Sequence, residues 1–194
     1  MEEIKYMEKP EWVSWEAIAD CLHKAHIANQ KKGFVMPGLN ISADIFRKQI
    51  RDGHCFVALD GDKVVGTCSV IYKRYKRRWW AKGIVAYTGF DAILPEYQGT
   101  DVYFGLQDIR KKQIRESGVE IVCFNTAEPN KVVQKIALKD GAKYVQFARA
   151  KNSAYYSVIM AKWLHGCPYP DWFCNFMFKL SKKIVKTFWK PKKA

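Results

Sequence analysis

Apolar residues recur with a helical period through the N-terminal part of the chain. In residues 11–33, one face of the predicted helix carries Trp15, Ile18, Ala19, Leu22 and His26. Ser14 is its predicted N-cap, and Gly33 lies beyond its end. Residues 40–53 predict a second helix with Ser42 as N-cap. The chain is therefore expected to open with two helices.

The spacing of apolar residues then changes to that of strands. Residues 54–75 hold two runs rich in Val and Ile on either side of Asp60-Gly61-Asp62, a sequence typical of a hairpin turn. Residues 83–94 form another apolar run, which ends before Pro95 because proline cannot continue a central strand. This part of the chain predicts a hairpin followed by a further strand.

A helical period returns in residues 99–117. One face of this predicted helix carries Val102, Leu106, Ile109 and Gln113. The side chains expected to face solvent are Arg110, Lys111, Lys112 and Arg115. The helix is therefore expected to cover a sheet with its apolar face.

The next elements complete the predicted sheet. Residues 119–124 read as a buried strand and residues 128–141 as a short helix, and residues 142–150 and 154–164 read as two closing strands. Neither a repeat nor a linker interrupts this order. Residues 1–168 are therefore expected to form one mixed α/β (α+β) domain, with a mostly antiparallel sheet flanked by helices.

The C-terminal segment, residues 169–194, predicts a basic amphipathic helix. At about 100° per residue, one wedge of the helix holds Lys179, Lys182, Lys183, Lys186 and Lys190. Much of the opposite side holds Trp172, Phe173, Phe176, Met177, Leu180, Ile184 and Phe188. Lysines beside bulky apolar residues are typical of a helix in a membrane interface, so residues 171–194 are expected to bind an anionic membrane surface. A terminal helix packed on the domain and a dimer contact are the alternatives.

Composition adds a large excess of positive charge to this picture. Hydrophobic residues make up 48% of the chain and aromatic residues 14%, which is typical of a globular protein with a packed core. The formal net charge is +14. Such an excess attracts an anionic partner, whether nucleic acid, an acidic lipid surface or a phosphorylated cofactor.

The cysteines and the N-terminus indicate a cytoplasmic protein. The six cysteines are Cys21, Cys55, Cys68, Cys123, Cys167 and Cys174. None of them forms a C-x-x-C pair, and none lies at ligand spacing from a second Cys and His pair, so no metal is expected. The acidic N-terminus lacks the apolar core of a signal peptide, and no apolar run reaches the length of a membrane span. The expected location is the cytoplasm, at the inner membrane face if the C-terminal segment binds lipid.

Three segments carry a resemblance to a known family. CFVALDGDKVVGTCSV (55–70) resembles the second and third strands of the GNAT family of N-acetyltransferases. YTGFDAILPEYQG (87–99) resembles the fourth strand and the pyrophosphate loop of that family, and NKVVQKIALKDGAKYVQF (130–147) resembles its last helix and the strand after it. The resemblance implies the GNAT fold, acetyl-CoA or another acyl-CoA as co-substrate, and an amine acceptor.

The loop of the family has the pattern Q/R-x-x-G-x-G/A at the start of a helix. By this resemblance the residues that bind the cofactor phosphates are Gln98, Gly99, Thr100, Asp101, Val102 and Tyr103. Backbone amides and the helix dipole favour an anion there. Asp101 and Tyr103 replace the two small residues of the pattern. The carboxylate would repel pyrophosphate, and the phenol ring would hinder close approach of the backbone.

The resemblance also implies which groups meet the thioester and pantetheine. The backbone amides expected to meet the cofactor are those of Ala92, Ile93 and Leu94. Asn125 is a candidate hydrogen-bond partner for pantetheine, with a cap for the following helix as the alternative. Asn130 matches the family's Asn at the start of the last helix. The Tyr that commonly protonates the leaving thiolate, seven residues later, is replaced by Ala137.

Two residues of the strand at 83–94 are candidate catalytic bases. Tyr87 lies near the position where some family members carry a catalytic Glu, and a packed aromatic residue is the alternative. Asp91 carries the only carboxylate of this strand. If this carboxylate is buried, its pKa is raised and it can accept a proton near neutral pH. The alternative is that Asp91 is exposed or ion-paired. His54 is a weaker candidate and more typical of a surface position.

The basic residues 73–82 leave a second class of function open. They are interleaved with Tyr75, Trp79 and Trp80, and such a segment can bind RNA by charge and stacking. The alternatives are that the segment borders the acceptor side of the active site, or that it is the solvated end of a hairpin. The sequence favours an acyl-CoA-dependent N-acyltransferase that acts on a small-molecule or glycan amine. An amino sugar of a surface-glycan precursor becomes the acceptor if the C-terminal segment binds a membrane. The alternative is a catalytically inactive GNAT-fold protein that binds an anionic partner.

Overall fold

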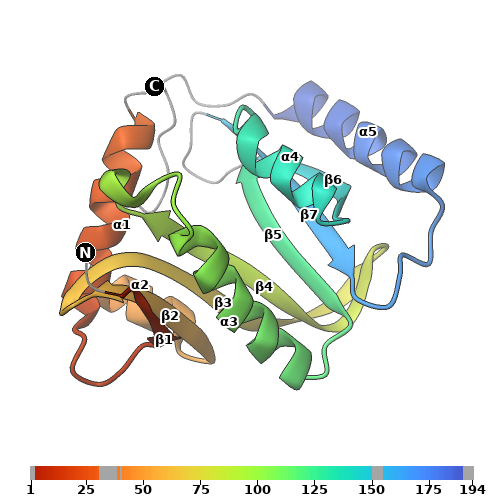
Figure 1. Ribbon diagram of the computed structural model, residues 1–194. Coiled ribbons are helices and arrows are strands. Elements are labelled where there is room, and N and C mark those ends of the chain that lie inside the picture. Colours follow the sequence, from red (N-terminus) through yellow and green to blue (C-terminus); the bar gives the residue numbers. More distant parts are fainter. Residues whose placement is uncertain (1–2, 31–38, 40, 150–154, 190–194) are drawn as a thin grey trace. The chain divides into compact units, whose positions relative to one another are not determined.

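The structure, a computed structural model, describes residues 3–30, 39, 41–149 and 155–189 (Figure 1). The backbone divides into two compact units. Unit 1 takes its residues from 1–72 and 88–118, and unit 2 takes its residues from 73–87 and 119–194. The long strands β3 (Lys63–Arg78) and β4 (Ala81–Ile93) each supply residues to both units.

Unit 1 contains the two N-terminal helices and the predicted hairpin. Helix α1 is Trp15–Gln30 and helix α2 is Ala43–Ile50. The predicted caps are confirmed, because the hydroxyl of Ser14 accepts from the N–H of Ala17 and that of Ser42 from the N–H of Ile45. Strand β2 (Gly53–Asp60) pairs antiparallel with β3, and Asp60 lies opposite Lys63 across the predicted turn. The predicted stop at Gly33 lies outside the described residues.

Strand β1 (Lys5–Glu8) was not expected from the sequence. It pairs antiparallel with β2, with Tyr6 opposite Ala58. Its Tyr6 ring lies against α3 (Val102–Glu116) at Gly105, where an added Cβ would come within 2.4 Å of the ring. Glycine at position 105 therefore permits this close approach.

The buried face of α3 is rotated from the one that the sequence predicted. The buried residues of α3 are Val102, Leu106, Arg110 and Ile114. Arg110 was expected to face solvent, yet only 5% of its surface is exposed. Buried positions at intervals of four residues form a row along a helix, and a charged residue in that row requires a counter-charge.

Unit 2 contains the remaining strands and helices. They are β5 (Ile121–Ala127), α4 (Lys131–Lys139), β6 (Lys143–Arg149), β7 (Tyr156–Trp163) and α5 (Asp171–Phe188). β5 runs parallel to β4 at Ala86 and Tyr87, and β7 pairs antiparallel with both β5 and β6. The strand order is β1-β2-β3-β4-β5-β7-β6, so the expected mixed and mostly antiparallel sheet is confirmed.

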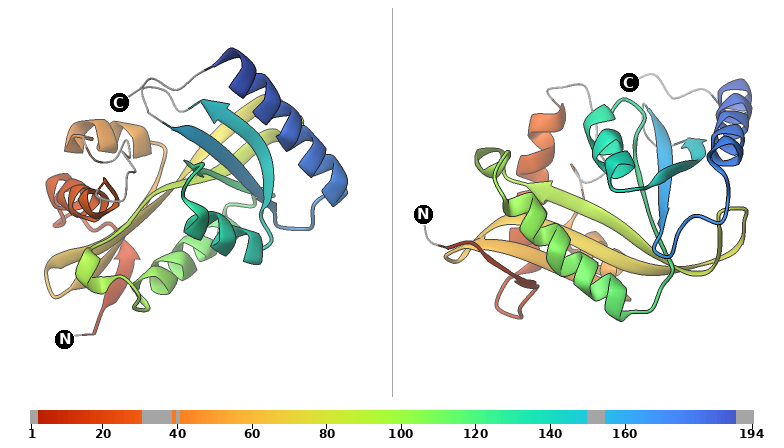
Figure 2. Two further views of the ribbon diagram at one scale, coloured as in Figure 1. Left: turned by 90° about the horizontal axis from the view of Figure 1, so that it is seen from above. Right: turned by 45° about the vertical axis from the view of Figure 1, so that its right-hand side comes forward.

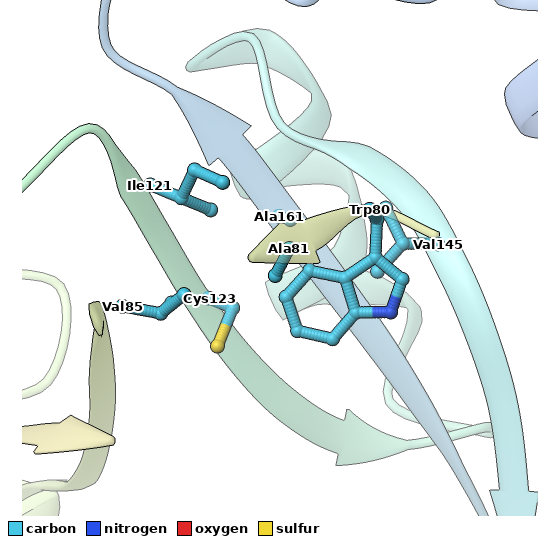
Figure 3. Close-up of a cluster of buried hydrophobic side chains, with 7 residues drawn as sticks. All are labelled: Trp80, Ala81, Val85, Ile121, Cys123, Val145 and Ala161. Atoms are coloured by element: carbon cyan, nitrogen blue, oxygen red, sulfur yellow. The ribbon is translucent and has the colours of Figure 1, made fainter. Parts of the chain in front are cut away.

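A core cluster of unit 2 lies around Trp80 (Figure 3). Trp80 is buried, and Tyr75 and Trp79 pack against the cluster from the same hairpin. Trp79 also meets Phe173 edge to face, with 5.4 Å between ring centroids. The aromatic residues of the basic segment 73–82 therefore contribute to the core of unit 2, and RNA binding by this segment stays an untested alternative.

Helix α5 lies along β6 within unit 2 (Figure 2). Phe178 of α5 stacks on Tyr144 with 4.9 Å between centroids, and the Ser181 hydroxyl accepts from the N–H of Phe147 at 2.9 Å. Lys190 and the rest of residues 190–194 lie outside the described residues. Among the helices that the structure describes, none is long and apolar enough to cross a membrane.

Candidate functional site

The end of β4 directs one backbone N–H away from β3. The N–H of Leu94 donates to the carbonyl of Val65 on β3 at 2.9 Å. Because successive residues of an antiparallel strand alternate in direction, Ile93 turns to the opposite edge, where its carbonyl accepts from Gln98 Nε2 at 3.1 Å. The expectation that Leu94 offers its N–H to a cofactor is therefore wrong, and the same alternation turns Ala92 toward β3. Only Ile93 retains the expected direction.

The loop after β4 is held by hydrogen bonds between its own groups. It begins with the short 3-10 helix η2 (Pro95–Tyr97). The hydroxyl of Thr100 donates to the carbonyl of Tyr97 at 2.6 Å and accepts weakly from the N–H of Val102 at 3.4 Å. Gly99 has a φ of +84°, a conformation that favours glycine. The loop is thus fixed in a tight turn that leads directly into α3.

The N-terminus of α3 receives no cap from its own N-cap residue. Asp101 is the N-cap residue, but its carboxylate makes no capping hydrogen bond. Burial and then the Asp101 charge raise the pKa of Tyr6, whose ring lies against α3 at Gly105. The Tyr103 ring lies edge to face with that of Phe104, with 5.6 Å between centroids. The helix end offers backbone amides to an anion, while Asp101 opposes it.

Asp91 supplies the counter-charge of buried Arg110. Its carboxylate accepts from both terminal nitrogens of Arg110, at 2.5 and 2.9 Å, and Arg110 also donates to the carbonyl of Ser69 and the side chain of Gln107. Burial disfavours the charged guanidinium, but Asp91 together with the nearby Cys68 and Tyr103 outweighs burial, so the pKa of Arg110 is raised. The expected buried, proton-accepting Asp91 is corrected: 39% of its side chain is exposed, and it is ion-paired.

Tyr87 lies in a polar cluster of unit 2. Its hydroxyl donates to the side-chain oxygen of Asn125 on β5, and Lys73 Nζ lies 3.6 Å from the centre of its ring. Burial raises the pKa of Tyr87, with the nearby Cys123 and Tyr75 acting in the same direction. Burial lowers the pKa of Lys73. A phenol whose pKa is raised in this way keeps its proton at neutral pH, so it is a poor base, and it is also a weaker acid than an exposed tyrosine.

Asn125 and Asn130 have different roles from one another. Asn125 belongs to β5 and caps no helix, and its side chain is exposed apart from the hydrogen bond to Tyr87. Asn130 is the N-cap of α4 and accepts from the N–H of Val133 at 3.5 Å. Ala137 of α4 packs into the cluster around Phe147. The helix face of Ala137 therefore carries no proton donor at that position.

His54 belongs to a surface network of unit 1. Its Nδ1 lies 2.8 Å from a carboxylate oxygen of Glu8, and its Nε2 lies 3.3 Å from the side-chain nitrogen of Gln113. Both ring nitrogens therefore have partners. Within the described residues no group of three or more His, Cys, Asp or Glu side chains could hold a metal ion.

Two charged residues of these networks were missed by sequence reasoning. Lys73 belongs to a run of basic residues, so nothing in the sequence separates it from its neighbours. Arg110 occupies a position in the four-residue row of Val102 and Leu106, and that row was the available signal. Phe90 was also missed; its φ of +54° is uncommon for a non-glycine residue, and its ring packs on Phe46.

Solved structures of other proteins share this arrangement of strands and helices. No family model and no curated protein matches the sequence. The NatC complex bound to Gag peptide and CoA contains a chain that matches with a TM-score of 0.63 and 13% identity, over 84% of this chain and 99% of that one. An acetyltransferase of the GNAT family from Streptococcus pneumoniae matches with a TM-score of 0.58 and 12% identity, over 83% and 99%. The chain has the GNAT fold.

A third solved structure supports this assignment of the fold. An acetyltransferase from Streptococcus agalactiae matches with a TM-score of 0.60 and 19% identity, covering 84% of this chain and all of that one. Within the GNAT fold, the turn at Gln98 to Tyr103 follows β4 and opens α3, as the sequence resemblance implied. The fold thus supports the order of elements on which the predicted cofactor residues were assigned.

Proposed function

We propose that this protein is an N-acyltransferase that transfers an acyl group, in the first instance the acetyl group of acetyl-CoA, to an amine. The observation that carries the proposal is the end of β4 in unit 1. There Ile93 turns its N–H away from β3, and a tight loop leads into the N-terminus of α3, whose N-cap side chain makes no capping hydrogen bond. An acyl-CoA requires an N–H group that binds its carbonyl oxygen and a helix N-terminus that binds its phosphates.

Transfer requires three events at the thioester. The amine nitrogen attacks the carbonyl carbon, and the N–H of Ile93 stabilises the negative charge that develops on the carbonyl oxygen. The carbon–sulfur bond then breaks, and the CoA sulfur leaves with its electron pair. The former amine loses a proton and the thiolate gains one. The proton for the thiolate comes from solvent or from a side chain, and Tyr87, whose phenol is protonated at neutral pH, is the candidate donor to be tested by substitution.

The α3 end fits a phosphate only in part. Gly99 provides the turn and Gln98 ties the loop to Ile93, so the backbone is prepared for an anion. The Asp101 carboxylate opposes it, because a like charge at the site disfavours binding. We therefore expect weaker binding of acyl-CoA than the same turn would give with a small uncharged residue at position 101.

The proposed acceptor is an amine. The proposed transfer reaction uses no metal ion. One solved neighbour is bound to a peptide as well as to CoA, so peptide amines belong among the acceptors to be tested. The amino sugar of a lipid-linked glycan precursor remains a proposal from the C-terminal segment alone. A panel of a peptide N-terminus, free lysine and glucosamine separates these classes.

A second candidate function rests on one observation. Ala137 occupies the position of the family's thiolate-protonating Tyr and is packed into the core around Phe147. If neither Tyr87 nor another proton donor replaces that acid, the protein would bind an acyl-CoA or another anion without turning it over. The two candidates differ in activity but share the binding site.

Titration calorimetry with acetyl-CoA and CoA, followed by thiol release with the acceptor panel, tests both candidates. We expect binding that weakens about five-fold or more in Gln98→Glu, because a charge is added beside the phosphates. Gln30→Glu adds the same charge on an exposed residue of α1 and should leave the affinity unchanged. Tyr87→Phe should lower kcat without changing the affinity.

Each result decides between the candidates. Binding without thiol release for any amine would support the inactive binding protein. No binding of either ligand at millimolar concentration would overturn both. Equal kcat in Tyr87→Phe and the unmodified protein would remove Tyr87 from the mechanism while leaving the transferase proposal in place.

A further inference from the structure

Helix α5 carries two separate apolar rows. The first row packs on β6 and includes Cys174, Phe178 and Val185. Cys174 is almost fully buried, and Ser181 between these residues is hydrogen-bonded to the backbone of Phe147. This row accounts for the attachment of α5 to unit 2, so any other apolar side chain of the helix requires a different explanation.

The second row faces away from β6. It consists of Trp172, Phe176, Leu180, Ile184 and Phe188. These five residues follow one another at intervals of four, and their exposed fractions lie between 40% and 74%. Side chains at such intervals are neighbours along a helix. Together they form an apolar surface over the whole length of α5, which we call the outer row. A continuous exposed row of large apolar side chains is typical of an interaction site.

Lysines border the outer row on one side. Lys179 and Lys183 each precede a member of the outer row by one position, and both are exposed. Lys182 and Lys186 turn instead toward Glu128, at 2.9 and 3.7 Å. The wedge of lysines that the sequence predicted is therefore divided, with part of it paired to Glu128 and part beside the apolar surface. The sequence adds three lysines in residues 190–194.

We propose that the outer row of α5 is a docking surface for an anionic lipid bilayer, on which the helix lies parallel to the membrane plane. Apolar side chains would enter the boundary between headgroups and acyl chains, while Lys179 and Lys183 extend to the lipid phosphates. The net charge of +14 favours the same partner, because the cytoplasmic leaflet is negative.

Charge argues against a second copy of this chain as the occupant. A two-fold interface brings the same patch of both subunits together. Lys179 and Lys183 of the two copies would then face one another, and like charges at an interface oppose association. An anionic bilayer satisfies the lysines and the apolar row at once.

Co-sedimentation of the full chain with vesicles tests the proposal. We expect binding to vesicles with about 30% phosphatidylglycerol, and much weaker binding to pure phosphatidylcholine. Phe176→Ser with Leu180→Ser should weaken binding by about ten-fold or more, because the middle of the apolar row is lost. Both side chains are exposed, so the variant should keep its circular dichroism spectrum and melting temperature.

Matched variants separate the outer row from general effects. Ile45→Ser with Val132→Ser removes two exposed apolar side chains from α2 and α4 and should bind as the unmodified chain does. Lys179→Gln with Lys183→Gln should weaken binding more than Lys135→Gln with Lys139→Gln, which removes the same charge from exposed positions of α4. A difference within each pair supports the outer row.

Three outcomes would overturn the proposal. The first is equal binding by the outer-row variant and the unmodified chain. The second is equal binding to neutral and anionic vesicles. The third is a dimer in sedimentation analysis that Phe176→Ser with Leu180→Ser dissociates, together with no vesicle binding, which would make the outer row a contact between copies of the chain.

Discussion

Arg110 is a buried guanidinium, and its interactions determine what Asp91 can do. Two hydrogen bonds from Arg110, at 2.5 and 2.9 Å, occupy the Asp91 carboxylate. A buried charge without a partner is costly, so the Asp91 carboxylate stabilises the folded chain by pairing with Arg110. This argument removes Asp91 from the list of catalytic bases and leaves Tyr87 and the N–H of Ile93 as the groups to test.

Asp91→Asn should therefore act on stability. We expect the free energy of unfolding to fall by about 1–3 kcal/mol, less than for a fully buried pair because the Asp91 side chain is 39% exposed. Urea unfolding provides the measurement. Glu96→Gln, which breaks the exposed pair with Lys63, should give no resolvable change. A full loss of activity with unchanged stability would instead return Asp91 to a catalytic role.

His26 should make the stability of the protein dependent on pH. Burial and the charge of His23 lower its pKa, against a smaller opposing effect of Asp91. The unfolded chain then binds a proton below the ordinary pKa of about 6.5 while the folded chain does not, so stability falls as pH falls through that value. The slope is at most about 1.4 kcal/mol per pH unit. His26→Gln should flatten the dependence of the urea midpoint between about pH 7.5 and 5.5, and an unchanged slope would contradict this origin.

At the scale of elements, the spacing of apolar residues predicted most of the fold because each helix and strand buries one regular row of side chains. The hairpin of β2 and β3, the α3 helix and the closing strands all follow that rule. β1 was missed because four residues are too few for a period to emerge. The buried face of α3 was predicted wrongly because Arg110 is charged, and charged residues are normally exposed. Partners distant in sequence, such as Asp91, are invisible to a local pattern.

The local sequence pattern is also insufficient for helix α5, because this helix carries two rows of apolar side chains. Phe178 lies in the row on β6, and Phe176 lies in the outer row. Phe178→Ala should lower the free energy of unfolding by about 2–4 kcal/mol, since the ring packs on Tyr144 and Phe147. Phe176→Ala should change it by less than about 0.5 kcal/mol. Chemical unfolding of the two variants distinguishes the rows, and equal losses would mean that both rows are packed.

These two rows also change how membrane binding should be tested. Deleting residues 171–194 would remove the outer row, but it would also uncover the cluster around Phe147 that α5 packs against. Loss of vesicle binding by the deleted chain would then report unfolding as readily as docking. Point substitutions within the outer row keep the contacts with β6 and test the surface alone.

At the scale of the whole molecule, the net charge of +14 acts on every anionic ligand. Acetyl-CoA carries its negative charge on phosphates, whereas S-acetylpantetheine offers the same thioester without them. A positive field concentrates the first donor near the protein and has no effect on the second. Salt screens such a field over about 10 Å at 0.1 M, so ionic strength separates electrostatic attraction from contacts at the thioester.

The KM for acetyl-CoA should therefore rise about three- to ten-fold between roughly 50 and 500 mM salt, while the KM for S-acetylpantetheine should stay constant. Steady-state thiol release with each donor provides the comparison. Asp101→Asn should lower the KM for acetyl-CoA at every salt concentration, because it removes the opposing carboxylate at the start of α3. It should not alter the KM for the uncharged donor. A salt dependence shared by both donors would show that the phosphates are not what the protein attracts, and the α3 turn would then lose its proposed role.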